Sequence, residues 1–245
     1  MNLQSFKLIA LLLSLFLPSV SHATIVRIET SLGDIQVNLY DEATPESVSN
    51  FLDYVNAGSY GSTLFHRSVS GFILQGGGFA YNNSWPPIAI SSNAAVTNEP
   101  IYSNVRGTLA YAKLGGQPNS ATNQWFFNLA NNGTNLDNQN SGFTVFGEVM
   151  DNGMDIVDAI ADLSTYNLGG SFAEIPLQNY TTGTDPNDTN IILIIRKNII
   201  KNSFYIFFRI ILFIRLINIR SSLFKCNKLI IIKKLINIFF FNKYT

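Results

Sequence analysis

The sequence has very few of the residues that most often carry out metal, redox and proton-transfer chemistry. Only one of its 245 residues is cysteine, Cys226, and only two are histidine, His22 and His66. His66 alone cannot build a histidine-based metal site, and no cysteine in its domain could help, so we expect no metal and no cofactor. The chain also lacks a G-x-S-x-G segment, and no Lys-Ser/Thr pair follows glycines 76–78. These absences argue against a serine hydrolase and against a phosphate-binding loop.

Positive charge is scarce in most of the chain, and negative charge is missing from its end. All 16 acidic residues lie between Glu29 and Asp188, whereas the range 24–195 contains only four basic residues. From residue 196 onward there are 11 basic residues and no acidic one. The formal net charge of zero therefore averages an acidic domain and a cationic tail. An acidic domain of this kind argues against a nucleic-acid partner.

The N-terminus has the pattern of a secretory signal peptide over residues 1–23. Lys7 supplies a positive charge, an apolar run follows over 8–17, and small residues flank His22 in Ser21-His22-Ala23. The alternative is a membrane anchor, but the apolar run is short for a span of about 20 residues. We expect export with cleavage after Ala23, into a bacterial periplasm or, alternatively, by secretion.

The tail, residues 196–245, consists almost entirely of Ile, Phe, Lys, Asn, Leu and Tyr. Its apolar stretch is interrupted by Arg209 and Arg215, and charges at bilayer depth are costly. Three interpretations stay open: a disordered extension, a cationic membrane-associated helix, or AT-rich DNA translated past a lost stop codon. We favour the last, because codons of A and T alone specify these six residue types.

The range between signal and tail, 24–195, is predicted to be mainly β. Residues 25–30 and 34–40 alternate apolar and polar side chains around a short turn, which predicts a hairpin. Thr44 and Pro45 are suited to begin a helix that ends near Gly58. Short strands broken by Gly, Asn and Pro fill 62–150, and a second short helix over 155–163 and a last strand over 189–195 follow.

One segment combines an arginine, a glutamine and three glycines around an apolar run. It reads Phe65-His66-Arg67-Ser68-Val69-Ser70-Gly71-Phe72-Ile73-Leu74-Gln75-Gly76-Gly77-Gly78, and a second segment reads Asn119-Ser120-Ala121-Thr122-Asn123-Gln124-Trp125-Phe126-Phe127. Together they resemble the two core motifs of the cyclophilins, which are peptidyl-prolyl cis-trans isomerases. The resemblance implies a closed eight-stranded antiparallel barrel capped by two α-helices, over about residues 24–195.

The resemblance also implies a site. Arg67 matches the catalytic arginine, and Gln75 matches the side chain that orients it. The substrate-binding positions are matched by Phe72, Ile73, Ala112, Lys113, Gln124, Phe126, Leu136 and Phe143. For Lys113 only the backbone is expected to pair with the peptide. Asn135 replaces a tryptophan that contacts cyclosporin in some members, so tight binding of that drug is not expected.

The chemistry of prolyl isomerisation agrees with these residue types. Rotation about the amide has a barrier of roughly 18–20 kcal/mol and transfers no proton, so no base, nucleophile or metal is needed. A permanently charged arginine can donate to the nitrogen lone pair that twisting localises. His66 is therefore expected to be a structural residue beside the site and not a base.

The sequence thus predicts an exported isomerase that acts as a monomer on proline-containing polypeptides and unfolded exported proteins. The alternative is a binding or chaperone module that holds proline-containing segments without catalysis, with or without a membrane tether through the tail.

Overall fold

The structure is a computed structural model and describes residues 23–200. The predicted signal peptide, 1–23, except for Ala23, and most of the predicted tail, 196–245, lie outside these residues.

The predicted hairpin is confirmed. Strands β1 (Ile25–Thr30) and β2 (Gly33–Leu39) pair antiparallel, with Ile28 opposite Ile35 and with adjacent chain positions turned to opposite faces. Ile28 and Ile35 are fully buried, whereas the residues that alternate with them are partly exposed. The alternation of apolar and polar residues in the sequence therefore indicates a sheet that turns one face toward the core.

Eight strands form a closed antiparallel barrel, as predicted. Their order around the barrel is β3-β11-β1-β2-β8-β6-β7-β4, and pairing of β4 with β3 closes the ring. Closure leaves no unpaired strand edge on the ring. The remaining six strands of the ring are β3 (Thr63–Val69), β4 (Ile73–Ala80), β6 (Thr108–Tyr111), β7 (Trp125–Asn128), β8 (Val145–Val149) and β11 (Leu193–Ile200).

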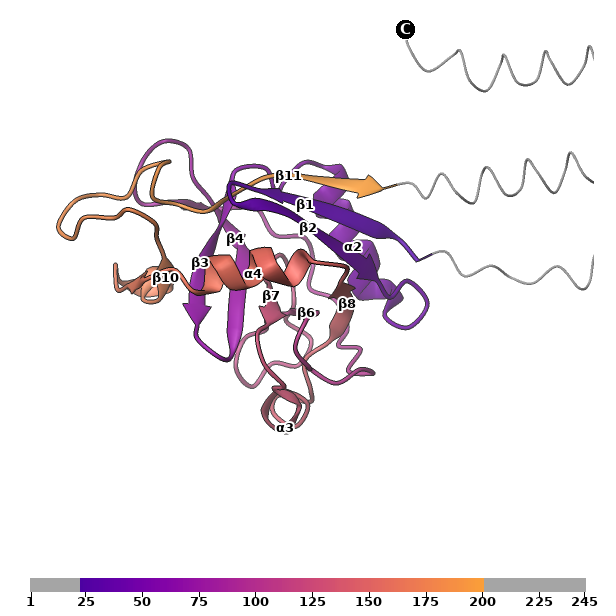
Figure 1. Cartoon of the computed structure of the whole chain (residues 1–245). Helices are drawn as coiled ribbons and strands as arrows, with labels where there is room; N and C mark the ends of the chain where they lie inside the picture. Colours follow the sequence, from indigo (N-terminus) through magenta and orange to yellow (C-terminus); the bar gives the residue numbers. More distant parts are fainter. Residues whose placement is uncertain (1–22, 201–245) are drawn as a thin grey trace, which may run out of the picture. The chain divides into compact units, whose positions relative to one another are not determined.

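Within residues 23–200, three very short strands and one 3-10 turn lie outside the ring. Strand β5 (Ile88–Ala89) pairs with the end of β4, and β9 (Thr165–Tyr166) pairs with β10 (Ile175–Pro176). The 3-10 turn η1 (Gly170–Phe172) precedes β10. Figure 1 shows β10 beside β3 at one edge of the barrel.

The last strand differs from its predicted range, 189–195. Strand β11 starts at Leu193 and continues to Ile200, because its backbone pairs with β1 as far as Ile25 opposite Ile200. The first five residues assigned to the tail are thus part of the sheet. A pairing partner far away in the sequence extends the strand, and this cannot be read from the local composition.

Helix α2 (Pro45–Asn56) begins and ends near the predicted positions, with Thr44 at its N-cap. Thr44 makes no side-chain cap bond there. Instead, the Glu99 carboxylate accepts the backbone N–H of Ser47 at 2.9 Å, in a position that also suits the positive end of the helix dipole. A distant residue therefore caps this helix.

Two further helices complete the fold. Helix α4 (Gly153–Ala161) begins and ends two residues earlier than the predicted range, 155–163. Its first residue, Gly153, packs so close to Val149 that a Cβ would lie 2.7 Å from the Val149 side chain. The short helix α3 (Gly133–Leu136) was not predicted. In Figure 1, α4 crosses in front of the strands and α2 lies behind β1 and β2.

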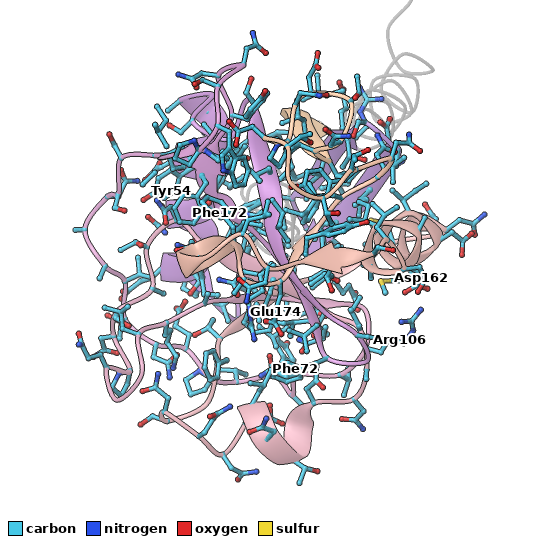
Figure 2. All side chains as sticks on the ribbon, turned by 90° about the vertical axis from the view of Figure 1, so that its left-hand side faces the viewer. Tyr54, Phe72, Arg106, Asp162, Phe172 and Glu174 are labelled. Carbon is cyan, nitrogen blue, oxygen red and sulfur yellow. The ribbon has the colours of Figure 1, made fainter. Side chains whose placement is uncertain are left out.

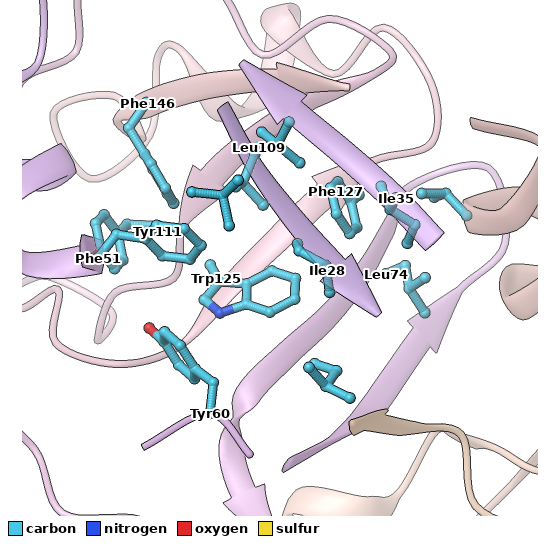
Figure 3. Close-up of a cluster of buried hydrophobic side chains, with 14 of the residues drawn as sticks. Ile28, Ile35, Phe51, Tyr60, Leu74, Leu109, Tyr111, Trp125, Phe127 and Phe146 are labelled. Carbon is cyan, nitrogen blue, oxygen red and sulfur yellow. The ribbon is translucent and has the colours of Figure 1, made fainter. Parts of the chain in front are cut away.

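The barrel interior is filled by aromatic and aliphatic side chains. Trp125 is fully buried at its centre, and its ring meets Phe65 edge-on at 5.8 Å and Phe127 at 5.5 Å between centroids. Figure 3 shows this cluster, including Phe51 of α2 and Leu74 of β4. The interior is therefore a packed core, and any site must lie on the outer face of the barrel.

Candidate active site

A hollow of about 210 Å³ lies over the outer face of β4 and β7. Its lining combines apolar walls with a polar rim. The lining residues are Arg67, Phe72, Ile73, Gln75, Ala112, Lys113, Phe126, Leu136, Gln139 and Phe143.

Strand alternation explains the apolar wall of this hollow. In β7 Trp125 and Phe127 belong to the interior core, whereas Phe126 between them packs on the outside with Ile73 and Leu136. In the same way, Leu74 of β4 points inward and Ile73 outward. Phe126 and Gln75 stand opposite each other in the register of β4 and β7, so an apolar and an amide side chain meet there.

Helix α3 and the loop after it supply the far wall. The Asn132 side chain donates to the backbone carbonyl of Phe72 at 2.8 Å, and the Phe143 backbone N–H donates to the carbonyl of Leu136 at 3.0 Å. The Phe143 ring meets Phe126 nearly perpendicularly, at 6.0 Å between centroids. These bonds hold segments from three parts of the chain around one hollow.

Arg67 reaches the hollow from β3 and is paired with an acidic residue 107 positions away. Its Nε donates to Oε2 of Glu174 at 2.7 Å, and both side chains are partly exposed. Glu174 lies directly before β10 and does not line the hollow. Figure 2 faces this side of the molecule and labels Glu174 together with Phe72 and Phe172.

Gln75 lies opposite Arg67 in the register of β3 and β4, but its side-chain amide bonds elsewhere. Its Nε2 donates to Oε1 of Gln124 at 2.8 Å. Among the described residues no hydrogen bond joins Gln75 to Arg67, so the predicted orienting role of Gln75 stays a prediction. The Gln124 side chain packs over Gly78, where a Cβ would lie 2.7 Å from it. This glycine therefore leaves space for Gln124.

Lys113 has side-chain contacts that the sequence did not predict. Its Nζ donates to Oδ1 of Asn98 at 3.0 Å and to the carbonyls of Asn140 and Gly142, and lies 4.7 Å from the centre of the Phe143 ring. Burial lowers the pKa of Lys113 to about 8. The lysine thus ties the loop that carries Phe143 to the opposite side of the hollow.

His66 is buried, with only 2 % of its surface exposed, and does not line the hollow. Its ring packs edge-on against Phe79 at 5.0 Å between centroids. Burial lowers the pKa of His66 to about 4, so the ring is neutral near pH 7. A sealed neutral ring of this kind is consistent with the structural role predicted for it.

The structure brings nearly all of the predicted site residues together. Only Gln124 of the predicted substrate-binding set lies outside the lining, one hydrogen bond behind Gln75. Two residues were missed: Gln139, in the loop after α3, and Glu174. Both are outside the two motifs and carry no local pattern that marks them, because only the folded chain brings Gln139 to the hollow and Glu174 to Arg67.

Within residues 23–200, no group of three or more His, Cys, Asp or Glu side chains is placed to hold a metal ion. Over the same residues, no helix is long and apolar enough to cross a membrane.

Comparison with known proteins agrees with the geometry. Residues 25–182 match the family model described as cyclophilin type peptidyl-prolyl cis-trans isomerase/CLD. The chain belongs to the cyclophilin family. It is therefore a peptidyl-prolyl cis-trans isomerase, and the fold described above is that of a cyclophilin.

Curated relatives of this cyclophilin are bacterial as well as eukaryotic. The chain is 41% identical over 147 residues to a peptidyl-prolyl cis-trans isomerase of Acinetobacter baylyi, covering 60% of this chain and 76% of the relative. It is 38% identical over 167 residues to peptidyl-prolyl cis-trans isomerase B of Escherichia coli, covering 63% of this chain and 93% of the relative.

Solved structures show the same fold. A cyclophilin type peptidyl-prolyl cis-trans isomerase of Cryptosporidium parvum superposes with a TM-score of 0.55 at 24% sequence identity, covering 74% of this chain and 99% of that one. The same protein has been solved in the presence of the dipeptide Ala-Pro, with a TM-score of 0.53 to this chain.

Proposed function

We propose that this cyclophilin catalyses the isomerisation of X-Pro bonds through Arg67, in the folding of exported proteins. The observation that carries the proposal is that a permanently charged donor, Arg67, lines the same hollow as a set of apolar side chains. Phe72, Ile73 and Phe126 would hold the ring by excluding water from it.

The proposed mechanism needs no covalent chemistry. The planar amide is stabilised by resonance, and twisting it localises a lone pair on the prolyl nitrogen. A hydrogen bond from an N–H of Arg67 to that nitrogen is stronger in the twisted state of the amide than in the planar state. If this bond gains about 3 kcal/mol at the transition state, the rate rises roughly a hundredfold.

The proposal is tested by measuring exchange between cis and trans forms of an X-Pro peptide by NMR, with the full chain as catalyst. For Arg67→Ala we expect kcat/KM to fall about a hundredfold, because only the transition-state bond is removed. Arg106→Ala is the matched control, since Arg106 also pairs with a carboxylate, Asp158, but lies away from the hollow. Unchanged activity of Arg67→Ala would refute the mechanism.

The same experiment separates catalysis from simple binding of proline-containing segments. A non-catalytic binding module would keep its affinity for the peptide in Arg67→Ala and would show little exchange in either protein. Catalysis predicts strong exchange in the wild type and weak exchange with retained binding in the variant.

The cellular setting is proposed from the N-terminal sequence. Clients would be unfolded exported proteins that contain proline, in a bacterial periplasm or outside the cell. Cell fractionation followed by N-terminal sequencing tests this: the exported protein should begin at Thr24. A protein that keeps its first residues and stays inside the cell would contradict the proposal.

The tail's role is tested by a high-salt wash of membranes carrying the full chain, because salt weakens electrostatic docking on anionic lipid.

A further inference from the structure

We propose that Glu174 is a positioning residue, which holds the guanidinium of Arg67 in the orientation needed to donate to the prolyl nitrogen. The inference rests on the catalytic role proposed for Arg67. It starts from the 2.7 Å hydrogen bond between Arg67 Nε and Glu174 Oε2. Neither of the two sequence motifs contains Glu174.

The backbone of Glu174 is anchored at the right place. Its carbonyl accepts the backbone N–H of Ser68 at 2.7 Å, and Glu174 forms a parallel bridge with Arg67 itself. The residues around it are sealed: Phe172 is only 9% exposed and Ile175 is fully buried. The carboxylate is therefore delivered to β3 by a segment that has little freedom to move.

The hydrogen bond from Nε to Glu174 leaves the two outer nitrogens of Arg67 available to donate to substrate. A guanidinium has five N–H donors in a rigid plane, and Nε carries the innermost one. Holding this N–H restricts rotation of the plane, while the four outer N–H groups stay unused by Glu174. Arg67 lines the hollow and Glu174 does not, so the carboxylate supports the guanidinium from outside the substrate space.

The sequence predicted that Gln75 orients Arg67, but the structure shows no hydrogen bond between these two described residues. Gln75 stands opposite Arg67 but donates to Gln124. Among the described residues, Glu174 provides the hydrogen bond that orients this arginine. Both side chains are roughly two-fifths exposed, so water screens their charges. Glu174 therefore acts mainly by orienting the guanidinium of Arg67, and less by neutralising its charge.

The experiment measures kcat and KM separately for Glu174→Ala and Glu174→Gln in the full chain. In Glu174→Ala we expect kcat to fall about tenfold, equal to about 1.4 kcal/mol, with KM within about twofold, because the donor is misplaced but the pocket is intact. Glu174→Gln keeps an oxygen acceptor and should retain at least about half of kcat, since hydrogen bonding and not charge is required.

Two controls separate positioning from a structural effect. Asp158→Ala removes the carboxylate of the Arg106 pair, which is similarly exposed but lies outside the hollow, and should leave kcat unchanged. The NMR signal of the Arg67 Nε–H should shift in Glu174→Ala and return toward its wild-type position in Glu174→Gln. A loss of stability alone would leave kcat of the folded protein unaffected.

A double-mutant cycle distinguishes this proposal from the proposed function. Both proposals hold if Arg67→Ala loses activity, if Glu174→Ala alone lowers kcat, and if Glu174→Ala has no further effect in the Arg67→Ala background. If Arg67→Ala loses activity but Glu174→Ala alone keeps the wild-type kcat, only the positioning role is overturned. It is equally overturned if Glu174→Gln loses as much as Glu174→Ala, or if Glu174→Ala lowers kcat as much without Arg67 as with it.

Discussion

The inner and outer faces of β4 and β7 are made by the same strands but differ in what their side chains meet. Inside, Leu74 and Phe127 are packed on all sides by other apolar side chains. Outside, Ile73 and Phe126 are nearly as buried, yet they border an open hollow with a polar rim. One residue step along the chain therefore separates a core position from a pocket position.

This difference teaches that burial alone does not tell a structural residue from a functional one. Phe127 is fully buried and Phe126 is 2% exposed, so the two residues are almost equal by that measure. What differs is the space beyond the ring: sealed core for Phe127, and a hollow of about 210 Å³ for Phe126. Substitutions on the inner face should act on stability, and those on the outer face on catalysis.

The strongest test substitutes alanine for each of the two neighbouring phenylalanines. Phe127→Ala should lower the free energy of unfolding by about 3–5 kcal/mol, because it opens a sealed cavity. Phe126→Ala should cost clearly less stability, since water can enter the enlarged hollow, but should raise KM about tenfold or more through lost contact with proline. Denaturant unfolding and peptide kinetics measure both. Equal losses of stability with unchanged KM would contradict the comparison.

His66 is a buried residue that lies outside the hollow, and its titration tests whether such a residue affects stability and not catalysis. Its pKa is about 4 in the folded chain and about 6.5 when unfolded, so its contribution to stability is complete above pH 6.5 and declines as pH falls toward 4. We expect a loss of about 3 kcal/mol over this window, at about 1.4 kcal/mol per pH unit. The comparison is the unfolding free energy of the wild type against His66→Phe, which should lack this slope.

The same pair of proteins separates stability from catalysis. Between pH 6.5 and 8 the two should have similar kcat, because the ring is neutral and outside the hollow. A large loss of kcat in His66→Phe at pH 7, with the protein folded, would show that His66 belongs to the site.

A substitution at Gly78 tests the hydrogen bond between Gln124 and Gln75 beside the hollow. In Gly78→Ala the new Cβ would lie 2.7 Å from the Gln124 side chain and displace it from Gln75. We expect kcat/KM to fall by about three- to tenfold, or about 0.7–1.4 kcal/mol, while the barrel stays folded. Gly71→Ala is an informative contrast, since it has open space but a φ of +66°, which should affect stability instead.

Lys113 gives the smallest expected effect, and one that depends on pH. Its pKa of about 8 means that it loses its proton as pH rises from 7 to 9, which weakens its bonds to the loop carrying Phe143. We expect KM to rise about threefold over this range, less than 1 kcal/mol. Lys113→Arg, which stays charged, should show a flat profile. A matching rise in Lys113→Arg would exclude the lysine as the cause.

Burial also makes the charge of Lys113 unfavourable for folding. Because its folded pKa lies below the unfolded value of 10.5, the unfolded chain binds more protons between pH 8 and 10.5. The contribution of this group to stability therefore rises with pH across that window, which the difference in unfolding free energy between wild type and Lys113→Met measures.

Much of the site was predictable because its residues recur at short, fixed spacings. Arg67, Phe72 and Gln75 fall within nine consecutive positions, and a strand pair keeps such spacings in space. Glu174 could not be found in this way, because it lies 107 residues from Arg67 and only the parallel bridge brings it there. The partner of Gln75 was likewise set by the packing of Gln124 over Gly78.

By itself, the sequence determined the hairpin, the start of α2, the barrel class and the residues of the pocket wall. The hairpin and the start of α2 follow from alternation and from Thr44-Pro45, which act over a few residues, whereas the barrel class and the pocket residues are implied by the resemblance to the cyclophilins. Only the tertiary structure decided that Glu99 caps α2, that β11 extends to Ile200 and that Glu174 holds Arg67. Each of these joins residues that are distant in sequence, and such contacts form only when the folded chain brings the two segments together.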